Sequence, residues 1–249
     1  MRLTFLGTGS AMPTGHRAQS GLLVEAGDRS LLVDCGSGVL GQLARTATGY
    51  ESVDAVLLTH HHLDHCSDLL PLVKARWLAG AGDLPIAGPS GTADLVDGLF
   101  EVHAYMQDRI ETPVTEVGPS AFSFAGFDVA AVETIHSMYG LAYRFAGDGD
   151  DAADLAYSGD TEASEAVADL ADGASVLVHD GSFPDDVDVS NHPTPSQLGA
   201  VLAGHDYGTV YLTHLYPHTE GRHQEMVASI GEHYDGDVRF ASDGLSVTI

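Results

Sequence analysis

Lysine is nearly absent from this sequence, and arginine is scarce. Ten basic residues, with Lys74 as the single lysine, stand against 36 acidic ones, so the formal net charge is −26. A protein that binds nucleic acid through Lys and Arg contacts to phosphates is basic, and salt weakens its binding steeply. The composition excludes that mode, so metal ions must neutralise much of any phosphate that the protein handles. The dispersed acidic residues predict adaptation to high salt, with a basic partner as the alternative.

Cysteine is rare, and long apolar runs are missing. Cys35 and Cys66 are too few for a disulfide framework, and both are expected to be small buried residues. No apolar stretch reaches the roughly 18 residues that span a membrane. The opening MRLTFLGTGSAMPT is typical of a strand entering a Gly-rich loop and not of a secretory leader. We therefore expect a soluble cytoplasmic protein with no membrane partner, folded as a single domain over residues 1–249.

Short apolar runs alternate with helical patterns along the whole chain. The periodicity predicts strands over residues 3–7, 21–27, 30–36, 54–60, 84–89, 122–136 (two, joined at Gly126), 140–146, 154–160, 174–183 and 209–215, and a strand or hairpin over 237–249. It predicts helices over 38–46, 67–79, 91–106, 162–171, 194–206 and 220–234. Residues 145–157 are expected to form a hairpin loop. This order favours an α/β protein with two mixed sheets packed together and helices outside, and not a simple doubly wound sheet.

The stretch LLTHHHLDHCSDL gathers metal-binding side chains directly after an apolar run. His60, His62, Asp64 and His65 follow the pattern His-x-His-x-Asp-His. Because a strand places alternate side chains on one side, His60 and His62 can converge on one metal ion. The chain then turns into a helix, whose start can direct Asp64 and His65 at a second ion. Mixed imidazole and carboxylate ligands suit zinc, manganese or iron, so the spacing indicates a two-metal site; a plain polar loop is the alternative.

Further ligand candidates stand at the ends of other apolar strands. His136, Asp160 and His214 each follow such a run, and together they repeat one arrangement in which a buried strand delivers a ligand at its C-terminal end. Asp34 fits the same arrangement as a carboxylate that orients a metal-bound histidine. His61 falls outside the pattern and is expected to point away.

These motifs, in this order, resemble the metallo-β-lactamase fold superfamily and, within it, ribonuclease Z. The resemblance rests on FLGTGSAMPT, LVDCG, THHHLDH, His136, YSGD, VLVHDGSF, NHPTPSQLGAVLA and VYLTHL. It implies a four-layer αβ/βα sandwich with two mixed β-sheets and helices on the outer faces. It also implies two Zn²⁺ ions per chain, one held by His60, His62 and His136, the other by Asp64, His65 and His214, with Asp160 bridging. Manganese or iron would accept the same ligands.

The same resemblance implies catalytic roles. Asp64 would accept a proton from the attacking water, and His192 would protonate the leaving oxygen or stabilise the phosphorane. Asp180 stands where the family usually has a glutamate, and would orient His192 with a shorter arm.

Substrate contacts are expected from four further residues, namely Thr8, Ser10, Arg17 and Thr194. Thr8 and Ser10 lie in the Gly-rich loop, for which a plain tight turn is an equal alternative. Arg17 belongs to the loop PTGHRAQ, which lacks the lysine and asparagine of the family's Pro-Thr-Lys-x-Arg-Asn motif.

One departure from ribonuclease Z bears on the substrate. Only 23 residues separate His136 from Asp160, where ribonuclease Z carries a long arm that clamps tRNA. The sequence therefore predicts a hydrolase of phosphodiester bonds in RNA without the arm used for tRNA 3′ processing. The alternatives are a phosphodiesterase for small cyclic nucleotides and a hydrolase of other esters, thioesters or lactams. A non-catalytic RNA-binding scaffold on this fold would have eroded ligands, but all seven are present. By analogy with the family, a homodimer is expected.

Overall fold

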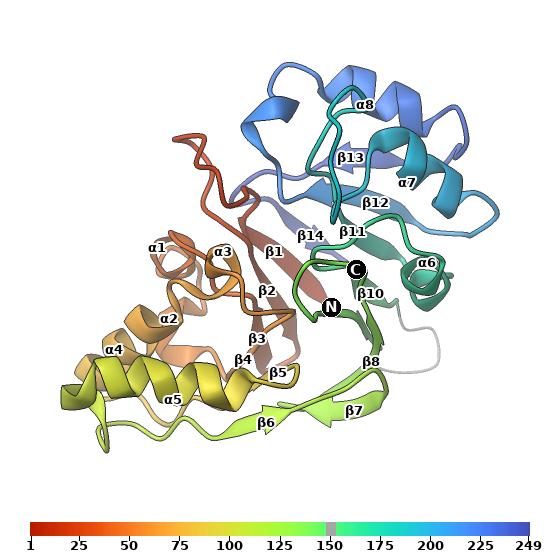
Figure 1. The fold of residues 1–249 in the computed structure, drawn as a ribbon. Helices are drawn as coiled ribbons and strands as arrows, with labels where there is room; N and C mark the ends of the chain where they lie inside the picture. The colour runs from red at the N-terminus through yellow and green to blue at the C-terminus, as the bar shows by residue number, and fades with distance from the viewer. Residues whose placement is uncertain (148–152) are drawn as a thin grey trace.

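Two seven-stranded sheets form the centre of the computed structural model, which describes residues 1–147 and 153–249 (Figure 1). The first sheet has the order β14-β1-β2-β3-β4-β5-β6. Its strands are β1 (Arg2–Gly7), β2 (Gly21–Ala26), β3 (Arg29–Val33), β4 (Ala55–Leu57), β5 (Ile86–Gly88), β6 (Val114–Glu116) and β14 (Ser246–Thr248). The strands from β14 to β3 pair antiparallel, and those from β3 to β6 pair parallel, so the sheet is mixed.

The second sheet repeats this mixed arrangement in the order β13-β12-β11-β10-β9-β8-β7. Its strands are β7 (Ala121–Phe124), β8 (Phe127–Glu133), β9 (Leu141–Phe145), β10 (Leu155–Tyr157), β11 (Val176–Asp180), β12 (Thr209–Thr213) and β13 (Val238–Phe240). The strands from β7 to β10 pair antiparallel, and those from β10 to β13 pair parallel.

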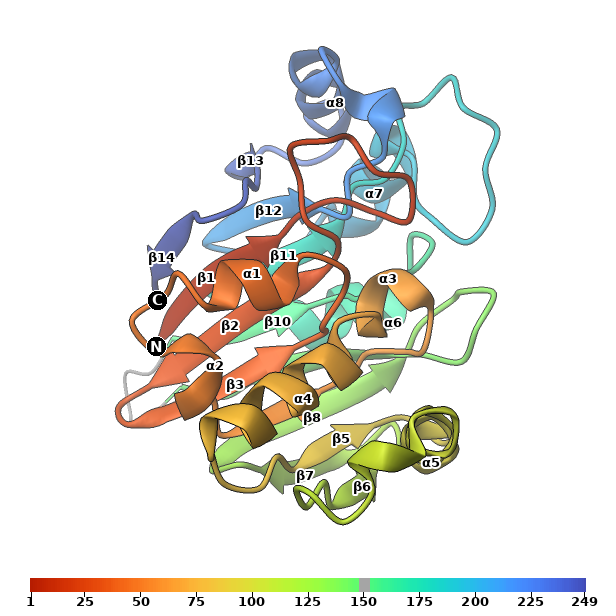
Figure 2. The same ribbon diagram turned by 90° about the vertical axis from the view of Figure 1, so that its left-hand side faces the viewer.

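Helices cover the outer face of each sheet (Figure 2). On the first sheet lie α1 (Val39–Leu43), α2 (Gly49–Ser52), α3 (Leu63–Cys66), α4 (Leu69–Ala79), α5 (Thr92–Val102) and the 3-10 turn η1 (Ala104–Met106). On the second lie α6 (Glu165–Ala171), α7 (Pro195–Leu202) and α8 (His223–Ile230), and the 3-10 turn η2 (Pro217–Thr219) precedes α8. The predicted four-layer αβ/βα sandwich is therefore confirmed. Among the helices of the described residues, none is long and apolar enough to cross a membrane.

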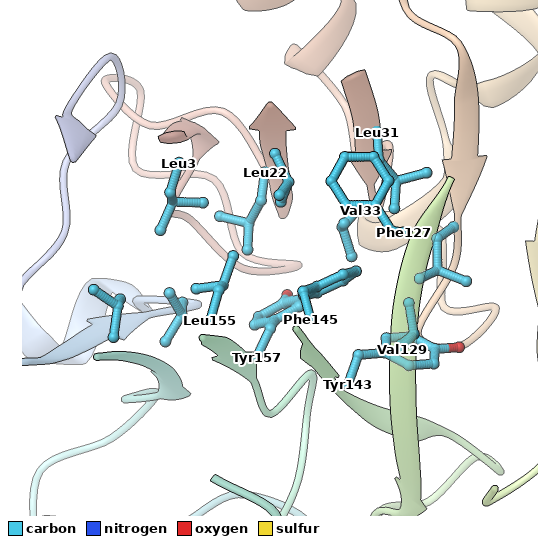
Figure 3. Close-up of a cluster of buried hydrophobic side chains, with 14 of the residues drawn as sticks. Leu3, Leu22, Leu31, Val33, Phe127, Val129, Tyr143, Phe145, Leu155 and Tyr157 are labelled. Carbon is cyan, nitrogen blue, oxygen red and sulfur yellow. The ribbon is translucent and has the colours of Figure 1, made fainter. Parts of the chain in front are cut away.

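The continuous apolar runs arise because the strands are buried on both faces. In β3, Leu31 and Val33 point into the core between the sheets, whereas Leu32 packs under the helices of the first sheet. This is the two-residue alternation of a strand. Figure 3 shows the inter-sheet core, where Tyr143 and Phe145 from β9 meet the side chains of the first sheet.

Three local expectations have different outcomes. The predicted strand or hairpin over 237–249 is two separate strands: β13 extends the second sheet beside β12, and β14 crosses to the first sheet beside β1. The strands β9 and β10 on either side of the expected hairpin loop pair antiparallel, and residues 148–152 of that loop lie outside the described residues. Both cysteines are buried, as expected.

The fold positions the site because both sheets direct strand ends to one edge. Asp34 follows β3, His60 lies beyond β4, and Asp160 follows β10. Asp180 ends β11, and His214 follows β12. The carboxyl ends of parallel strands are where α/β sheets bind ligands.

Candidate metal centre

The first cluster joins three imidazoles and a carboxylate. His62 Nδ1 lies 3.1 Å from both His60 Nε2 and His136 Nε2. Asp160 Oδ2 lies 3.7 Å from His60 Nε2 and 3.8 Å from His136 Nε2. Four ligand atoms placed tetrahedrally at about 2 Å from a zinc ion are roughly 3.3 Å apart, so these spacings fit a metal. Burial, reinforced by the nearby His65, lowers the pKa of His60 well below its usual value and keeps its ring neutral, as a metal ligand must be.

The second cluster adjoins the first through Asp160. It contains Asp64, His65 and His214, whose candidate ligand atoms lie within 4.8 Å of one another. His214 Nε2 is 3.1 Å from Asp64 Oδ2 and 3.3 Å from Asp160 Oδ2. His65 Nε2 is 3.2 Å from Asp160 Oδ1. Asp160 thus faces both clusters, which is the arrangement expected of a bridging ligand.

Two buried atoms in this region lack hydrogen bonds among the described residues. They are His65 Nε2 and Asp160 Oδ1, which face each other. His65 Nδ1 already lies 2.8 Å from Asp34 Oδ2, to which its N–H donates, so in a neutral ring Nε2 carries a lone pair. Burial lowers the pKa of His65, but the carboxylates of Asp160 and Asp34 outweigh burial and raise it, so without a cation a proton on Nε2 faces Asp160 Oδ1. Once that proton is lost, two electron pairs oppose each other in a buried place. A divalent cation would satisfy both, so these residues fit a metal.

Asp34 and Thr59 orient His60 and His65, which come from the N-terminal half of the chain. Asp34 Oδ1 accepts the Thr59 N–H at 2.8 Å, and the Thr59 hydroxyl donates to Asp34 Oδ2 at 2.9 Å. The same hydroxyl lies 3.0 Å from His60 Nδ1 and can accept its N–H. Asp34 therefore holds His65 directly and His60 through Thr59, and both rings are left with Nε2 for a metal.

Asp180 and Ser182 repeat this arrangement in the second half. The His192 Nδ1–H donates to Asp180 Oδ2 at 2.7 Å, so the shorter aspartate does reach the histidine. Ser182 Oγ donates to Asp180 Oδ1 and lies 2.9 Å from His214 Nδ1, whose N–H it can accept. Burial lowers the pKa of His192, but the carboxylates of Asp180, Asp160 and Asp64 together outweigh burial, and the pKa is raised overall. His192 is thereby biased toward its charged form.

Backbone groups also contribute to the geometry of the site. His136 Nδ1 lies 2.9 Å from the carbonyl oxygen of Asn191, which orients the third imidazole of the first cluster. Asn191, Asp34 and His214 all have a positive φ, of 70°, 61° and 57°. Such backbone is unfavourable outside glycine, and its occurrence at three residues around one site is typical of functional centres.

The clusters open into a cleft of about 420 Å³. Its described lining residues are Ala11, His62, Leu63, Asp64, His136, Ser137, Asp160, Asn191, His192 and Tyr216. Tyr216 stacks on Phe183 with ring centroids 4.3 Å apart. Burial raises the pKa of Tyr216 well above its usual value, so its hydroxyl stays protonated.

The residues expected to contact substrate lie outside that lining. Thr8 donates from its N–H to Asp243 Oδ1 at 3.0 Å, and Arg17 donates to the carbonyl of Ala241 at 3.0 Å. Ser10 is buried. Thr194 caps α7 in a capping box. Their role toward substrate stays a prediction.

Other local features follow from single contacts. His61 points away from the clusters, as expected, and its Nε2 lies 2.8 Å from Thr92 Oγ1.

The sequence did not predict four residues of the site, namely Thr59, Ser182, Asn191 and Tyr216. The first two carry a weak signal, since each is a hydroxyl residue within two positions of a predicted site residue. The carbonyl of Asn191 and the ring of Tyr216 carry none.

Comparison with known proteins identifies the family of the chain. A family model described as the β-lactamase superfamily domain matches residues 29–215. The ribonuclease Z of Mycobacterium bovis BCG is 30 % identical, with 98 % of this chain and 96 % of that protein covered. The metallo-β-lactamase fold protein YhfI from Bacillus subtilis is 27 % identical, with a TM-score of 0.84 and 99 % and 98 % of the two chains covered. The short form of human tRNase Z shares the fold at a TM-score of 0.80 and 22 % identity, with 100 % of this chain and 99 % of that chain covered.

The clustered histidines and aspartates are compatible with a divalent metal such as Zn²⁺, and the homology extends over nearly the whole chain. The chain therefore belongs to the β-lactamase superfamily, as a metal-dependent hydrolase of the ribonuclease Z-like group.

Proposed function

We propose that this protein is a metal-dependent nuclease that hydrolyses phosphodiester bonds in RNA at a centre of two Zn²⁺ ions. The pair of Asp180 and His192 beside the two ligand clusters is the observation that carries the proposal. A phosphate ester needs a proton for its leaving oxygen. A charged imidazole beside the two ligand clusters is placed to give one. The relatives named ribonuclease Z support RNA as the substrate.

The metal ligands proposed are His60, His62, His136 and Asp160 for one ion, and Asp64, His65, His214 and Asp160 for the other. When bound, the cations neutralise phosphate oxygens and acidify a water molecule.

The chain's own groups move the protons. Asp64 has a carboxylate oxygen at the second cluster and accepts the proton of the attacking water. His192 keeps Nδ1–H on Asp180, so Nε2 is the atom that donates to the leaving oxygen. Asp180 holds that tautomer and favours the charged ring.

The short segment between His136 and Asp160 supports an RNA substrate that is not clamped by a long arm. We expect single-stranded RNA to be cleaved with less selectivity for precursor tRNA. Hydrolysis of a small phosphodiester is the second candidate, favoured by a cleft of about 420 Å³.

The first test is cleavage of end-labelled precursor tRNA and of an unstructured RNA strand, in multimolar potassium chloride with zinc or manganese. Wild type should cleave the unstructured strand, Asp64→Ala should not, and His61→Ala should match wild type because that ring lies outside both clusters. The product ends distinguish internal cleavage from trimming at the 3′ end. Absence of cleavage of either RNA by wild type with confirmed metal content would move the assignment to a small phosphodiester.

Three broader expectations belong to the same proposal. We expect a homodimer, a cytoplasmic location and a surface adapted to high salt, the last because of the net charge of −26. Sedimentation and thermal unfolding across a series of potassium chloride concentrations test the first and third.

A further inference from the structure

The described lining of the cleft lacks the side chains with which nucleases usually hold an RNA backbone. Among its described lining residues there is no lysine or arginine. The acids Asp64 and Asp160 are directed at the metal clusters. The scissile phosphate can be neutralised there, but neighbouring phosphates find no cation in the cleft. Affinity for a substrate must therefore come from another part of the nucleotide.

Leu63 presents an apolar surface beside the ligand clusters. It lies between the ligand residues His62 and Asp64 on α3, lines the cleft, and is 78 % exposed. A single exposed leucine on a protein surface needs no explanation. This one stands where the substrate must bind, so it would be covered by whatever part of the substrate lies next to the scissile bond.

Tyr216 provides a second apolar surface from the other half of the molecule. It follows β12 and lines the same cleft. One face of its ring is stacked on Phe183, at an interplanar angle of 28°, and its centroid lies 5.7 Å from that of His192. The ring is thus held in place beside the proposed proton donor. Such a fixed ring is suited to stacking on a planar group.

We propose that Leu63 and Tyr216 bind the base adjacent to the scissile phosphate, so that the enzyme recognises a single-stranded nucleotide by its planar base and not by its flanking phosphates. This inference rests on the proposed function, because it places a phosphodiester at the metal clusters. The expected substrate is then a short, unpaired nucleotide segment whose base is free to stack. A paired base would be shielded in a duplex, whereas the end of an RNA strand presents its bases freely.

The test compares a dinucleotide with its counterpart that lacks the base next to the cleaved bond. Stacking of one base on an aromatic ring is worth about fivefold to a hundredfold in affinity. We expect wild type to show at least about tenfold lower kcat/KM on the abasic dinucleotide. Leu63→Ala and Tyr216→Ala should each lower kcat/KM on the complete dinucleotide by about fivefold or more, chiefly through KM, and change it little on the abasic one.

Matched variants separate recognition from damage to the site. Leu63→Met and Tyr216→Phe keep an apolar surface and a ring, and should restore the preference for the base. Leu78→Ala removes a leucine that is 69 % exposed on α4, outside the cleft lining, and should behave as wild type. Metal content measured by mass spectrometry should be equal in all variants. Calorimetry should find adenosine 5′-monophosphate bound about tenfold more tightly than ribose 5-phosphate.

The dependence of cleavage on salt provides an independent test of the proposal. For cleavage of longer RNA, the slope of log(kcat/KM) against log[KCl] should be shallower than about −1, because the protein neutralises only the scissile phosphate and not its neighbours. A steeper slope, or equal cleavage of the complete and abasic dinucleotides, would overturn the base-recognition proposal and leave the nuclease assignment in place. If metal-loaded wild type cleaves neither dinucleotide nor longer RNA, both proposals fail.

Discussion

Replacement of Asp34 by asparagine tests whether the buried carboxylate fixes the tautomer of a metal ligand. Asp34 is fully buried and accepts four hydrogen bonds: from the Thr59 N–H at 2.8 Å, the Thr59 hydroxyl at 2.9 Å, His65 Nδ1–H at 2.8 Å and the Tyr157 hydroxyl at 3.2 Å. Its φ of 61° is one that asparagine tolerates as well as aspartate. The substitution should therefore preserve the backbone and change only the hydrogen bonds.

An asparagine can satisfy only one side of this network. If its oxygen accepts from the Thr59 N–H, its amide group opposes the N–H of His65. The ring must then lose that bond or move its proton to Nε2, the atom that faces Asp160. A buried donor without a partner costs about 1–3 kcal/mol of unfolding free energy. Loss of a partner that orients a metal ligand typically weakens metal binding by about 10–100-fold, equivalent to about 1.4–2.7 kcal/mol.

Two measurements examine the Asp34→Asn variant. Competition with a chelator should show an apparent dissociation constant for zinc raised by about 10–100-fold, and urea unfolding of the metal-free protein should show a loss of about 1–3 kcal/mol. Asp94→Asn, at an exposed position of α5, is the control. If Asp34→Asn binds zinc as tightly as wild type, the carboxylate does not set the tautomer of His65 and the reasoning is wrong.

Three further predictions concern other side chains. His62→Ala should lose bound metal and hydrolysis, whereas His61→Ala should retain both within about twofold, as metal analysis and RNA cleavage would show. Arg76→Met should lower the unfolding free energy by about 3 kcal/mol in urea without changing metal content, because the buried guanidinium donates to five backbone carbonyls; an unchanged midpoint would contradict this. Burial lowers the pKa of His179, so the folded protein holds it neutral, and stability falls as the pH drops below about 6.5 toward the folded-state pKa. His179→Gln should therefore lose less unfolding free energy than wild type between about pH 7.5 and about pH 5.5, and an equal loss would argue against a neutral buried ring.

The residues of the two candidate ligand clusters were predictable because their signal is local. The pattern from His60 to His65 lies within six positions after one buried strand, and strand and helix geometry confine it to one place. His136, Asp160 and His214 were found by the repeated position at a strand end. Alternating and continuous apolar runs likewise predicted the strands and the layered fold, since burial on one or both faces is recorded directly in the residue pattern.

Contacts between distant segments were not predictable in the same way. Nothing in the sequence separates the C-terminal strands into different sheets, because β14 pairs with β1 across nearly the whole chain. The same holds for Arg17, whose contact with the carbonyl of Ala241 comes from the far end of the sequence.

The sequence by itself determined which residues are the candidates for the chemistry, because ligand type and spacing are local properties of the chain. Only the tertiary structure decided how those residues are oriented. The hydroxyls of Thr59 and Ser182 each lie between a carboxylate and an imidazole, and the carbonyl of Asn191 orients His136 across 55 positions of sequence. A hydrogen bond depends on distance and direction to about a few tenths of an ångström, which only the packing of the two sheets establishes.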